Sequence, residues 1–241
     1  MTALENKCAI KMENITKRFG SVVANNAINM ELREGEILSL LGENGSGKTT
    51  LMNMLSGIYF PDEGQIYIHD KPVTIASPKD AFDLGIGMIH QHFKLVDLFT
   101  ATENIILGLE GKLDLNNARK KVQDICDRYG FDIDPDMKIY DMSVSQKQTV
   151  EIVKVLYRGA DILILDEPTA VLTPQETDKL FTVMRNMKAD GKSLIIITHK
   201  LHEVLDVSDR VAVLRKGEYI GDVMTKDADQ QSLTDMMVGH S

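Results

Sequence analysis

The sequence predicts an α/β fold built on a mostly parallel central sheet. Two apolar runs rich in β-branched residues, DILILDE (161–167) and SLIIITH (193–199), each follow a helical stretch. Such strands are typically buried on both faces, as in a parallel sheet covered by helices. A third apolar strand, EILSLL (36–41), leads into a glycine-rich turn and then a helix. Polar groups follow all three strands, at the sheet edge where open α/β folds bind ligands.

The remaining elements are expected in chain order. Residues 8–12 and 22–32 alternate in places and are predicted strands, as is the alternating stretch GQIYIHD (64–70). Several helices are predicted from their end signals and apolar spacing. They are TTLMNMLSG, ended by Gly57, a short helix at Ser77–Pro78, and residues 101–108 and 115–129. Met52 and Met54 are interpreted as packing residues of a flexible core.

Composition limits the classes of function. The 241 residues, 43% apolar and 26% charged, suit a soluble globular protein of one large or two small domains. No apolar run approaches the roughly 20 residues of a membrane span. MTALENKC lacks an apolar stretch, so we expect no signal peptide. A net charge of −9 without a long basic run argues against nucleic-acid binding. Cys8 and Cys126 show no metal spacing and are expected to be reduced cytosolic thiols.

A phosphate site is predicted after the strand at 36–41. GENGSGKTT (42–50) matches G-x-x-x-x-G-K-[ST] between a predicted strand and a predicted helix, and we call it the phosphate loop. Glycines let backbone N–H groups turn inward around an anion, and the helix presents its positive end. Lys48 is expected to contact the β- and γ-phosphates and Thr49 to bind Mg²⁺. The candidate ATP-binding residues of this loop are Gly42, Glu43, Asn44, Gly45, Ser46, Gly47, Lys48, Thr49 and Thr50.

ILILDE (162–167) supplies the second half of such a site. Asp166, at a strand end, is expected to hold Mg²⁺ through water. Glu167 lies one residue further out and is the candidate general base for the attacking water. Together the two motifs predict a P-loop NTPase core that binds a Mg²⁺–nucleoside triphosphate.

From about residue 8 to 238 the chain resembles the ATP-binding subunits of ABC transporters. The likeness rests on several motifs in order, namely GEILSLLGENGSGKTT, HQHF (90–93), DEPTAVLTPQE (166–176) and ITHK (197–200). It implies an ATPase with an N-terminal antiparallel β subdomain and a helical subdomain at about 85–158. It also implies a second nucleotide-binding domain, paired head to tail, so that ATP lies between the phosphate loop of one domain and the signature of the other.

The resemblance also implies roles for individual residues. Phe19 stands at the aromatic position that stacks on adenine. Gln91 stands at the position of a glutamine that contacts Mg²⁺ and the attacking water. His199 stands where a histidine contacts the γ-phosphate and holds the base, here Glu167, and the water. Residues 170–173 (AVLT) correspond to a segment that crosses to the partner domain.

The segment MSVSQ (142–146) stands where the family has Leu-Ser-Gly-Gly-Gln, and we call it the signature segment. Members of the family that import simple sugars and nucleosides commonly have valine at the position of Val144. Ser145, in contrast, replaces the second glycine of the pattern. Ser143 and Gln146 also form a capping-box pattern, and a capped helix start is itself an anion site, so capping does not decide between the two interpretations. Serine at 145 would cost about 1–2 kcal/mol if positive φ is needed, or about 2.7–4 kcal/mol if a phosphate contact is lost. We interpret the segment as a weakened but usable signature for the partner's ATP.

The resemblance is strongest to importers of simple sugars and nucleosides. HQHFKLV (90–96) leans towards the nucleoside branch, and DMMVGHS (235–241) resembles the close of the first of two fused domains. We therefore expect a single nucleotide-binding domain, the first half of a longer chain. It would lie on the cytoplasmic face of the plasma membrane, against permease subunits served by an extracellular substrate-binding protein.

The sequence argues against two other classes of function. One is a soluble ABC ATPase that acts on ribosomes or nucleic acid, but such proteins generally carry coiled insertions or basic linkers, which this sequence lacks. The other is an ATP-gated assembly domain with little turnover, against which Glu167 and His199 argue.

Overall fold

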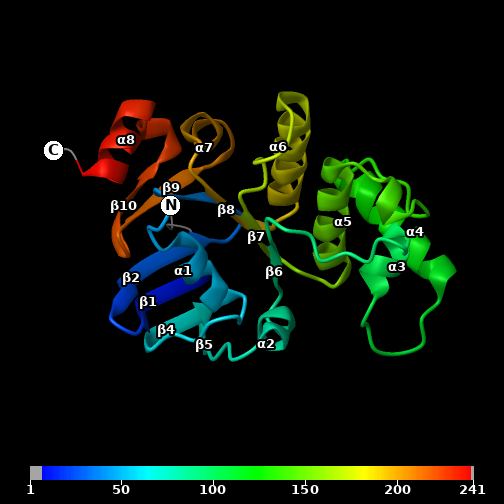
Figure 1. The fold of residues 1–241 in the computed structure, drawn as a ribbon, viewed down its shortest axis with the longest axis horizontal. Helices are drawn as coiled ribbons and strands as arrows, with labels where there is room; N and C mark the ends of the chain where they lie inside the picture. The colour runs from blue at the N-terminus through cyan, green and yellow to red at the C-terminus, as the bar shows by residue number, and fades with distance from the viewer. Residues whose placement is uncertain (1–6, 240–241) are drawn as a thin grey trace, which may run out of the picture.

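The computed structural model describes residues 7–239 and arranges them as two β-sheets with helices packed against the central sheet and beside it (Figure 1). The expectation of no signal peptide falls mainly on residues 1–6, and the end of DMMVGHS falls on residues 240–241. Both stretches lie outside the described residues. Within residues 7–239, no helix combines the length and the apolar character needed to cross a bilayer.

The central sheet has six strands in the order β10-β9-β3-β8-β7-β6. All neighbours are parallel except β9 and β10, which are antiparallel. The three strands predicted from apolar runs, β3, β8 and β7, lie side by side at its centre, which confirms the fold class. The strands are β3 (Ile37–Leu41), β6 (Ile86–Ile89), β7 (Ile162–Asp166), β8 (Ser193–Thr198), β9 (Arg210–Arg215) and β10 (Glu218–Met224).

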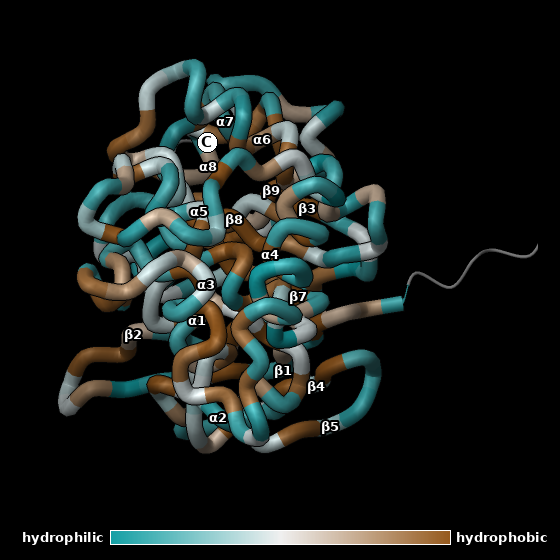
Figure 2. The backbone as a smooth tube through the Cα atoms, turned by 90° about the vertical axis from the view of Figure 1, so that its right-hand side faces the viewer, coloured by the Kyte–Doolittle hydropathy of each residue, from teal (hydrophilic) through white to brown (hydrophobic). Residues whose placement is uncertain are grey.

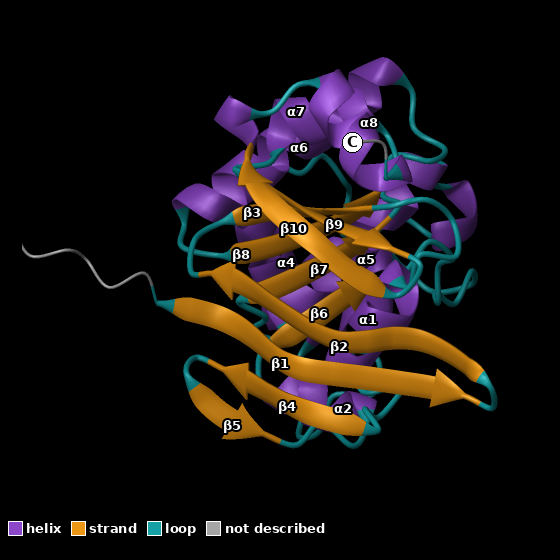
Figure 3. Ribbon diagram, turned by 90° about the vertical axis from the view of Figure 1, so that its left-hand side faces the viewer, coloured by secondary structure: helices purple, strands orange, loops and turns teal. Residues whose placement is uncertain are grey.

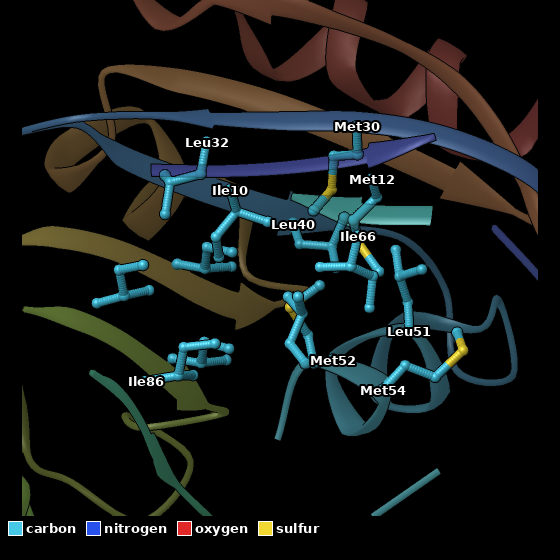
Figure 4. Packing of buried hydrophobic residues seen from close by; sticks show 14 of the residues in the cluster. Ile10, Met12, Met30, Leu32, Leu40, Leu51, Met52, Met54, Ile66 and Ile86 are labelled. Atoms are coloured by element: carbon cyan, nitrogen blue, oxygen red, sulfur yellow. The ribbon is translucent and has the colours of Figure 1, made fainter. Parts of the chain in front are cut away.

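The central strands are apolar throughout because both of their faces are buried. Leu38 and Leu40 point to one face of the sheet, and Leu163 and Leu165 belong to the core on the opposite face. The core on the side of Leu38 and Leu40 also contains side chains of the antiparallel sheet and of α1 (Lys48–Leu55). Figure 4 shows this packing for Ile10, Met52 and their neighbours. Met52 and Met54 are fully buried, which confirms their packing role.

The second sheet is antiparallel and lies at the N-terminal side of the molecule (Figure 3). Its order is β2-β1-β4-β5. The first strand continues well past the predicted residue 12 because it pairs with β2 along its whole length and with β4 on its other edge. The strands are β1 (Cys8–Phe19), β2 (Val22–Arg33), β4 (Glu63–Ile68) and β5 (Lys71–Val73).

The helical subdomain lies apart from the antiparallel sheet, on the right of Figure 1. It consists of α3 (Ala101–Ile106), α4 (Leu115–Tyr129) and α5 (Val144–Tyr157), which share a core that includes Ile105, Val122 and Val150. The expected range began at about residue 85, but β6 belongs to the central sheet, where it pairs with β7. In Figure 2, hydrophobic stretches of the backbone gather in the interior around β8, while many of the outer segments are hydrophilic.

The remaining helices cover the central sheet. Two of them, α6 and α7, follow directly after the strands that carry candidate site residues, and α6 begins with a capping box formed by Thr173 and Glu176. The helices that cover the central sheet are α2 (Pro78–Asp83), α6 (Pro174–Ala189), α7 (Leu201–Val207) and α8 (Gln230–Val238). Short 3-10 turns are present at Ile139–Asp141 and Thr225–Asp227.

One histidine joins the antiparallel sheet to the central sheet. His69 Nδ1 lies 3.0 Å from Glu34 Oε1, and Nε2 lies 2.9 Å from Asp161 Oδ2. Burial lowers the pKa of His69, but the hydrogen bonds and charges of Glu34 and Asp161 outweigh burial and raise the pKa above 6.5. The protonated His69 therefore stabilises the folded state fully below the unfolded pKa of about 6.5. This contribution to the free energy of unfolding is lost as pH rises through the higher pKa of the folded state.

We expect His69→Gln to lower the free energy of unfolding by about 0.5–1 kcal/mol more at pH 6 than at pH 9, since the pair is partly exposed. Urea unfolding at the two pH values measures this difference. The same change at the exposed His92 is the control. An equal loss at both pH values would contradict the ionic role.

Candidate active site

The phosphate loop connects the end of β3 to the start of α1. Gly47 has a φ of 100°, in the left-handed region that glycine tolerates. A Cβ there would lie 2.6 Å from the Ala24 carbonyl oxygen and 2.7 Å from Asn25 Nδ2. Glycine is therefore required both by conformation and by the close approach of β2.

The backbone of this loop keeps several donors free. Within residues 7–239, no protein group accepts a hydrogen bond from the N–H of Gly45, Gly47 or Lys48. Asn25 is fully buried and donates from Nδ2 to the Gly47 carbonyl over 3.1 Å. Free N–H groups at a helix start form an anion site, and Asn25 holds the loop backbone that presents them.

Lys48 is buried although its side chain is the cation of the phosphate loop. Its ammonium donates to the Gly42 carbonyl. Burial lowers the pKa of Lys48, while the negative charges of Glu167 and Asp166 oppose that effect. Conversely, burial and Glu167 raise the pKa of Asp166, and Lys48 lowers it. The site therefore combines one desolvated cation with two neighbouring carboxylates.

Glu167 follows β7 in an unusual conformation. Its φ of 47° is in the left-handed region, which non-glycine residues adopt rarely and mainly at functional sites. Its N–H donates to the Ile197 carbonyl on β8 over 2.9 Å. Its carboxylate oxygen Oε1 lies 3.0 Å from His199 Nδ1, so the base and the histidine predicted from separate motifs are in contact.

A hollow of about 310 Å³ collects most of the predicted residues. Gln91 enters it from the segment after β6, beside Lys48, Asp166 and Glu167. His199 reaches it only through its contact with Glu167. The lining consists of Asn44, Gly45, Ser46, Gly47, Lys48, Thr49, Thr50, Gln91, Asp166, Glu167 and Ile197.

Phe19 lies outside this hollow, at the end of β1. The residue is 43% exposed, and its ring meets Tyr59 edge to face at a centroid distance of 5.1 Å. The Lys17 ammonium lies 5.3 Å from the ring centroid. The structure therefore leaves an aromatic surface available, next to a cation and a second aromatic ring.

The signature segment lies in the helical subdomain, and its residues do not line the phosphate-loop hollow. Ser143, Ser145 and Gln146 line a separate hollow of about 540 Å³ between α5 and α6. Ser143 and Gln146 form the predicted capping box at the start of α5. Ser145 is in the first turn of this helix and has no positive φ. The strain alternative for Ser145 therefore does not apply.

The sequence analysis assigned no role to two residues that shape the site. Asn25 supports the phosphate loop, and Gln148 donates from Nε2 to the Pro168 carbonyl over 2.6 Å, next to Glu167. The only sequence signal was a polar residue at an otherwise apolar position, such as Gln148 on the buried side of α5. Such a position is not specific enough to predict a backbone partner.

The strand, glycine loop and helix, with a carboxylate pair beyond the neighbouring strand, define a P-loop nucleotide-binding domain. Residues 25–170 match the family model described as ABC transporter. Because this match covers more than half of the 241 residues, the chain belongs to the ABC transporter family.

Two curated relatives are 54% identical to the chain. One is the nucleoside import ATP-binding protein NupA of Lactococcus lactis subsp. cremoris, with 99% of this chain and 48% of the relative covered. The other is the guanosine import ATP-binding protein NupO of Bacillus subtilis, with 95% and 46% covered. The chain spans about half the length of the curated relatives it matches.

Solved structures show the same fold. MJ1267, an ATP-binding cassette of an ABC transporter in its ADP conformation, superposes with a TM-score of 0.83 at 25% identity, over 95% of this chain and 94% of that one. The ATP-binding cassette MJ0796, in a dimeric post-hydrolysis state with ADP and Pi, gives a TM-score of 0.77 at 26% identity, over 90% and 98%.

Proposed function

We propose that this domain binds and hydrolyses ATP and thereby powers import through membrane permease subunits. One observation carries the proposal: Lys48, Gln91, Asp166 and Glu167 line one hollow, and His199 contacts Glu167. A solved cassette of the same fold is described with ADP and Pi bound, which supports hydrolysis as the chemistry.

Each residue has a role that its position supports. The free N–H groups of the phosphate loop and the Lys48 ammonium bind the β- and γ-phosphates. Glu167 accepts a proton from the attacking water as general base, and His199 orients the Glu167 carboxylate and contacts the γ-phosphate. Gln91 positions the water, and Phe19 provides a face on which adenine stacks.

The residues present also fit Mg²⁺ as the metal of the substrate. The Thr49 hydroxyl, the Gln91 amide oxygen and the Asp166 carboxylate are all oxygen donors on one hollow. Mg²⁺ prefers such oxygen ligands together with substrate phosphates and water. When bound, it neutralises charge on the phosphate oxygens.

Two domains are needed for a complete site in this proposal. The signature segment lies outside the phosphate-loop hollow of its own chain, so it is free to contact ATP bound to another domain. Within residues 7–239, no protein group accepts a hydrogen bond from the N–H of Val144 or Ser145. These donors, with Ser143 and Gln146, would contact the partner's γ-phosphate. The second domain would come from the same longer chain or from a second copy.

The transported compound and the membrane partners are proposed from the relatives. The two curated relatives reported above are named for nucleoside and guanosine import. We propose nucleosides or simple sugars as substrates, permease subunits as partners and an extracellular substrate-binding protein in the full system. The domain would then lie on the cytoplasmic face of the plasma membrane.

ATP hydrolysis measured across protein concentration tests the function. We expect turnover that rises faster than linearly with the purified chain and disappears in Glu167→Gln. Co-purification with a permease in detergent would support the transport role, and co-sedimentation with ribosomes would contradict it. Failure to bind Mg-ATP would overturn the proposed site.

Ser145→Gly tests whether the Ser145 side chain hinders the contact between the signature segment and the partner's phosphate. Because Ser145 already has a helical backbone, glycine relieves no strain and destabilises the domain by about 0.5–1 kcal/mol. We expect turnover to rise by no more than about tenfold, which corresponds to about 1.4 kcal/mol. Steady-state hydrolysis and thermal unfolding measure the two effects. A rise of several hundredfold would mean that the serine side chain blocks the phosphate contact.

A further inference from the structure

Hydrogen bonds from two other elements hold the segment that carries Glu167, which we define as residues 166–170. The Glu167 N–H donates to β8, as described above. Thr169 is buried, and its hydroxyl donates to Glu203 Oε2 on α7 over 2.6 Å. The Lys200 ammonium donates to the Thr169 carbonyl over 3.2 Å. These contacts hold the segment from the side of the central sheet.

The opposite side is held by the helical subdomain. Gln148 is 8% exposed, and its Nε2 donates to the Pro168 carbonyl over 2.6 Å. Within residues 7–239, this is the only hydrogen bond that α3, α4 or α5 makes to residues 166–170. Among the hydrogen bonds of this segment, a displacement of α5 relative to the sheet therefore acts through the Gln148 side chain alone.

The position of Gln148 in α5 connects two functional elements. It lies five residues after Ser143 and two after Gln146 of the signature segment, in the helix that Ser143 caps. Its acceptor belongs to the residue after Glu167, and that residue is a proline. The proline ring fixes φ at Pro168. A movement of the Pro168 carbonyl is therefore passed on to Glu167, because the backbone between them has little freedom to absorb it. The left-handed φ of Glu167 also depends on support from its surroundings.

We propose that Gln148 is a positioning residue that couples the signature segment of this chain to Glu167 of the same chain. When the signature segment contacts ATP on a partner domain, α5 moves, and Gln148 transmits the movement to the Pro168 carbonyl and to Glu167. In a head-to-tail pair the two ATP sites would then respond to each other. This inference rests on the proposed function and adds a route between its two sites.

The first test does not require turnover. The N–H groups of Ala170 and Leu172 donate to the Glu167 and Thr169 carbonyls over 3.3 and 3.2 Å. We expect Gln148→Met to make hydrogen exchange at these two amides about three- to tenfold faster, with α1 unchanged. Gln123→Met is the matched control, because Gln123 lies exposed on α4 and hydrogen-bonds only Asp127 among the described residues. Unchanged exchange at both amides would overturn the inference.

The second test measures the reaction with Mg-ATP. We expect Gln148→Met to lower kcat by about ten- to a hundredfold, as misplacement of a catalytic group does, while the Kd for Mg-ATP stays constant. Gln148→Glu has a similar length, but its ionised carboxylate cannot donate to the carbonyl. The protonated carboxyl can donate, so the kcat of this variant should recover towards that of the unaltered chain as pH falls from 8 to 6.

The outcomes separate this inference from the proposed function. An unaltered chain that binds Mg-ATP but never hydrolyses it would contradict the proposed function, and the exchange data would still decide whether Gln148 holds the segment. A normal kcat in Gln148→Met, or an equal loss in Gln123→Met, would overturn the coupling. Loss of folding in Gln148→Met would leave the pH dependence of Gln148→Glu as the deciding result, and a flat pH profile would overturn the inference.

Discussion

Replacing Glu167 with glutamine is expected to lower ATP turnover by about 10²–10⁴-fold, the range for removal of a general base. The amide has nearly the same volume, and its oxygen can still accept from His199 Nδ1, which lies 3.0 Å from the carboxylate. It cannot take a proton from water. The loss should therefore appear in kcat, with Mg-ATP affinity retained.

Phosphate release in a single turnover and equilibrium binding of Mg-ATP measure the two quantities for Glu167→Gln. Glu218→Gln is the matched control, because Glu218 is exposed at the start of β10. A variant at 167 that kept normal turnover would place the general base elsewhere. One that lost both binding and turnover would show a role in holding the loop.

Removing the Lys48 ammonium is expected to have its main effect on binding. Loss of one partner of a buried charge pair costs about 2–5 kcal/mol, so Lys48→Ala should weaken Mg-ATP binding by about thirtyfold to several thousandfold. The same change removes the charge that lowers the pKa of Asp166. The carboxylates of Asp166 and Glu167 would then face the phosphates without this compensating cation.

Isothermal titration with Mg-ATP measures the effect of Lys48→Ala directly. Lys79→Ala is the control, because among residues 7–239 Lys79 makes only an exposed pair with Asp83, 3.1 Å apart on α2. Equal affinities in the two variants would contradict the assignment of residues 42–50 as the phosphate site.

The central sheet and the strand, loop and helix that carry the candidate phosphate site could be predicted because both leave dense local patterns. Strands buried on two faces are apolar throughout, and the loop, Lys48 and Thr49 occupy consecutive positions. The short strand β6 was not predicted, since its residues IGMI follow Gly85 and are too few to show a period. The predicted helical range consequently began too early. Of the peripheral elements, β9, β10, α7 and α8 were also not predicted.

Long-range contacts from side chain to backbone were beyond the sequence analysis. Asn25 and Gln148 bind carbonyl groups of residues far along the chain, and a carbonyl acceptor leaves no trace in the amino-acid type. The capping box at Ser143 and Gln146 was predicted and is present, because both partners lie in one helical turn. The structure added that Ser145 has helical geometry without positive φ, which excludes backbone strain, one of the two costs that the sequence analysis had left open.

The pairing of β6 with β7 has a consequence for how this chain folds. The two strands are parallel neighbours in the sheet, yet the whole helical subdomain lies between Ile89 and Ile162 in the sequence. Their pairing must close a long chain segment, and the entropy of that closure grows with the length of the loop. The helices between them have a core of their own, so their early collapse would shorten the effective loop. Mutations in that core should therefore slow the folding of the sheet that carries Asp166 and Glu167.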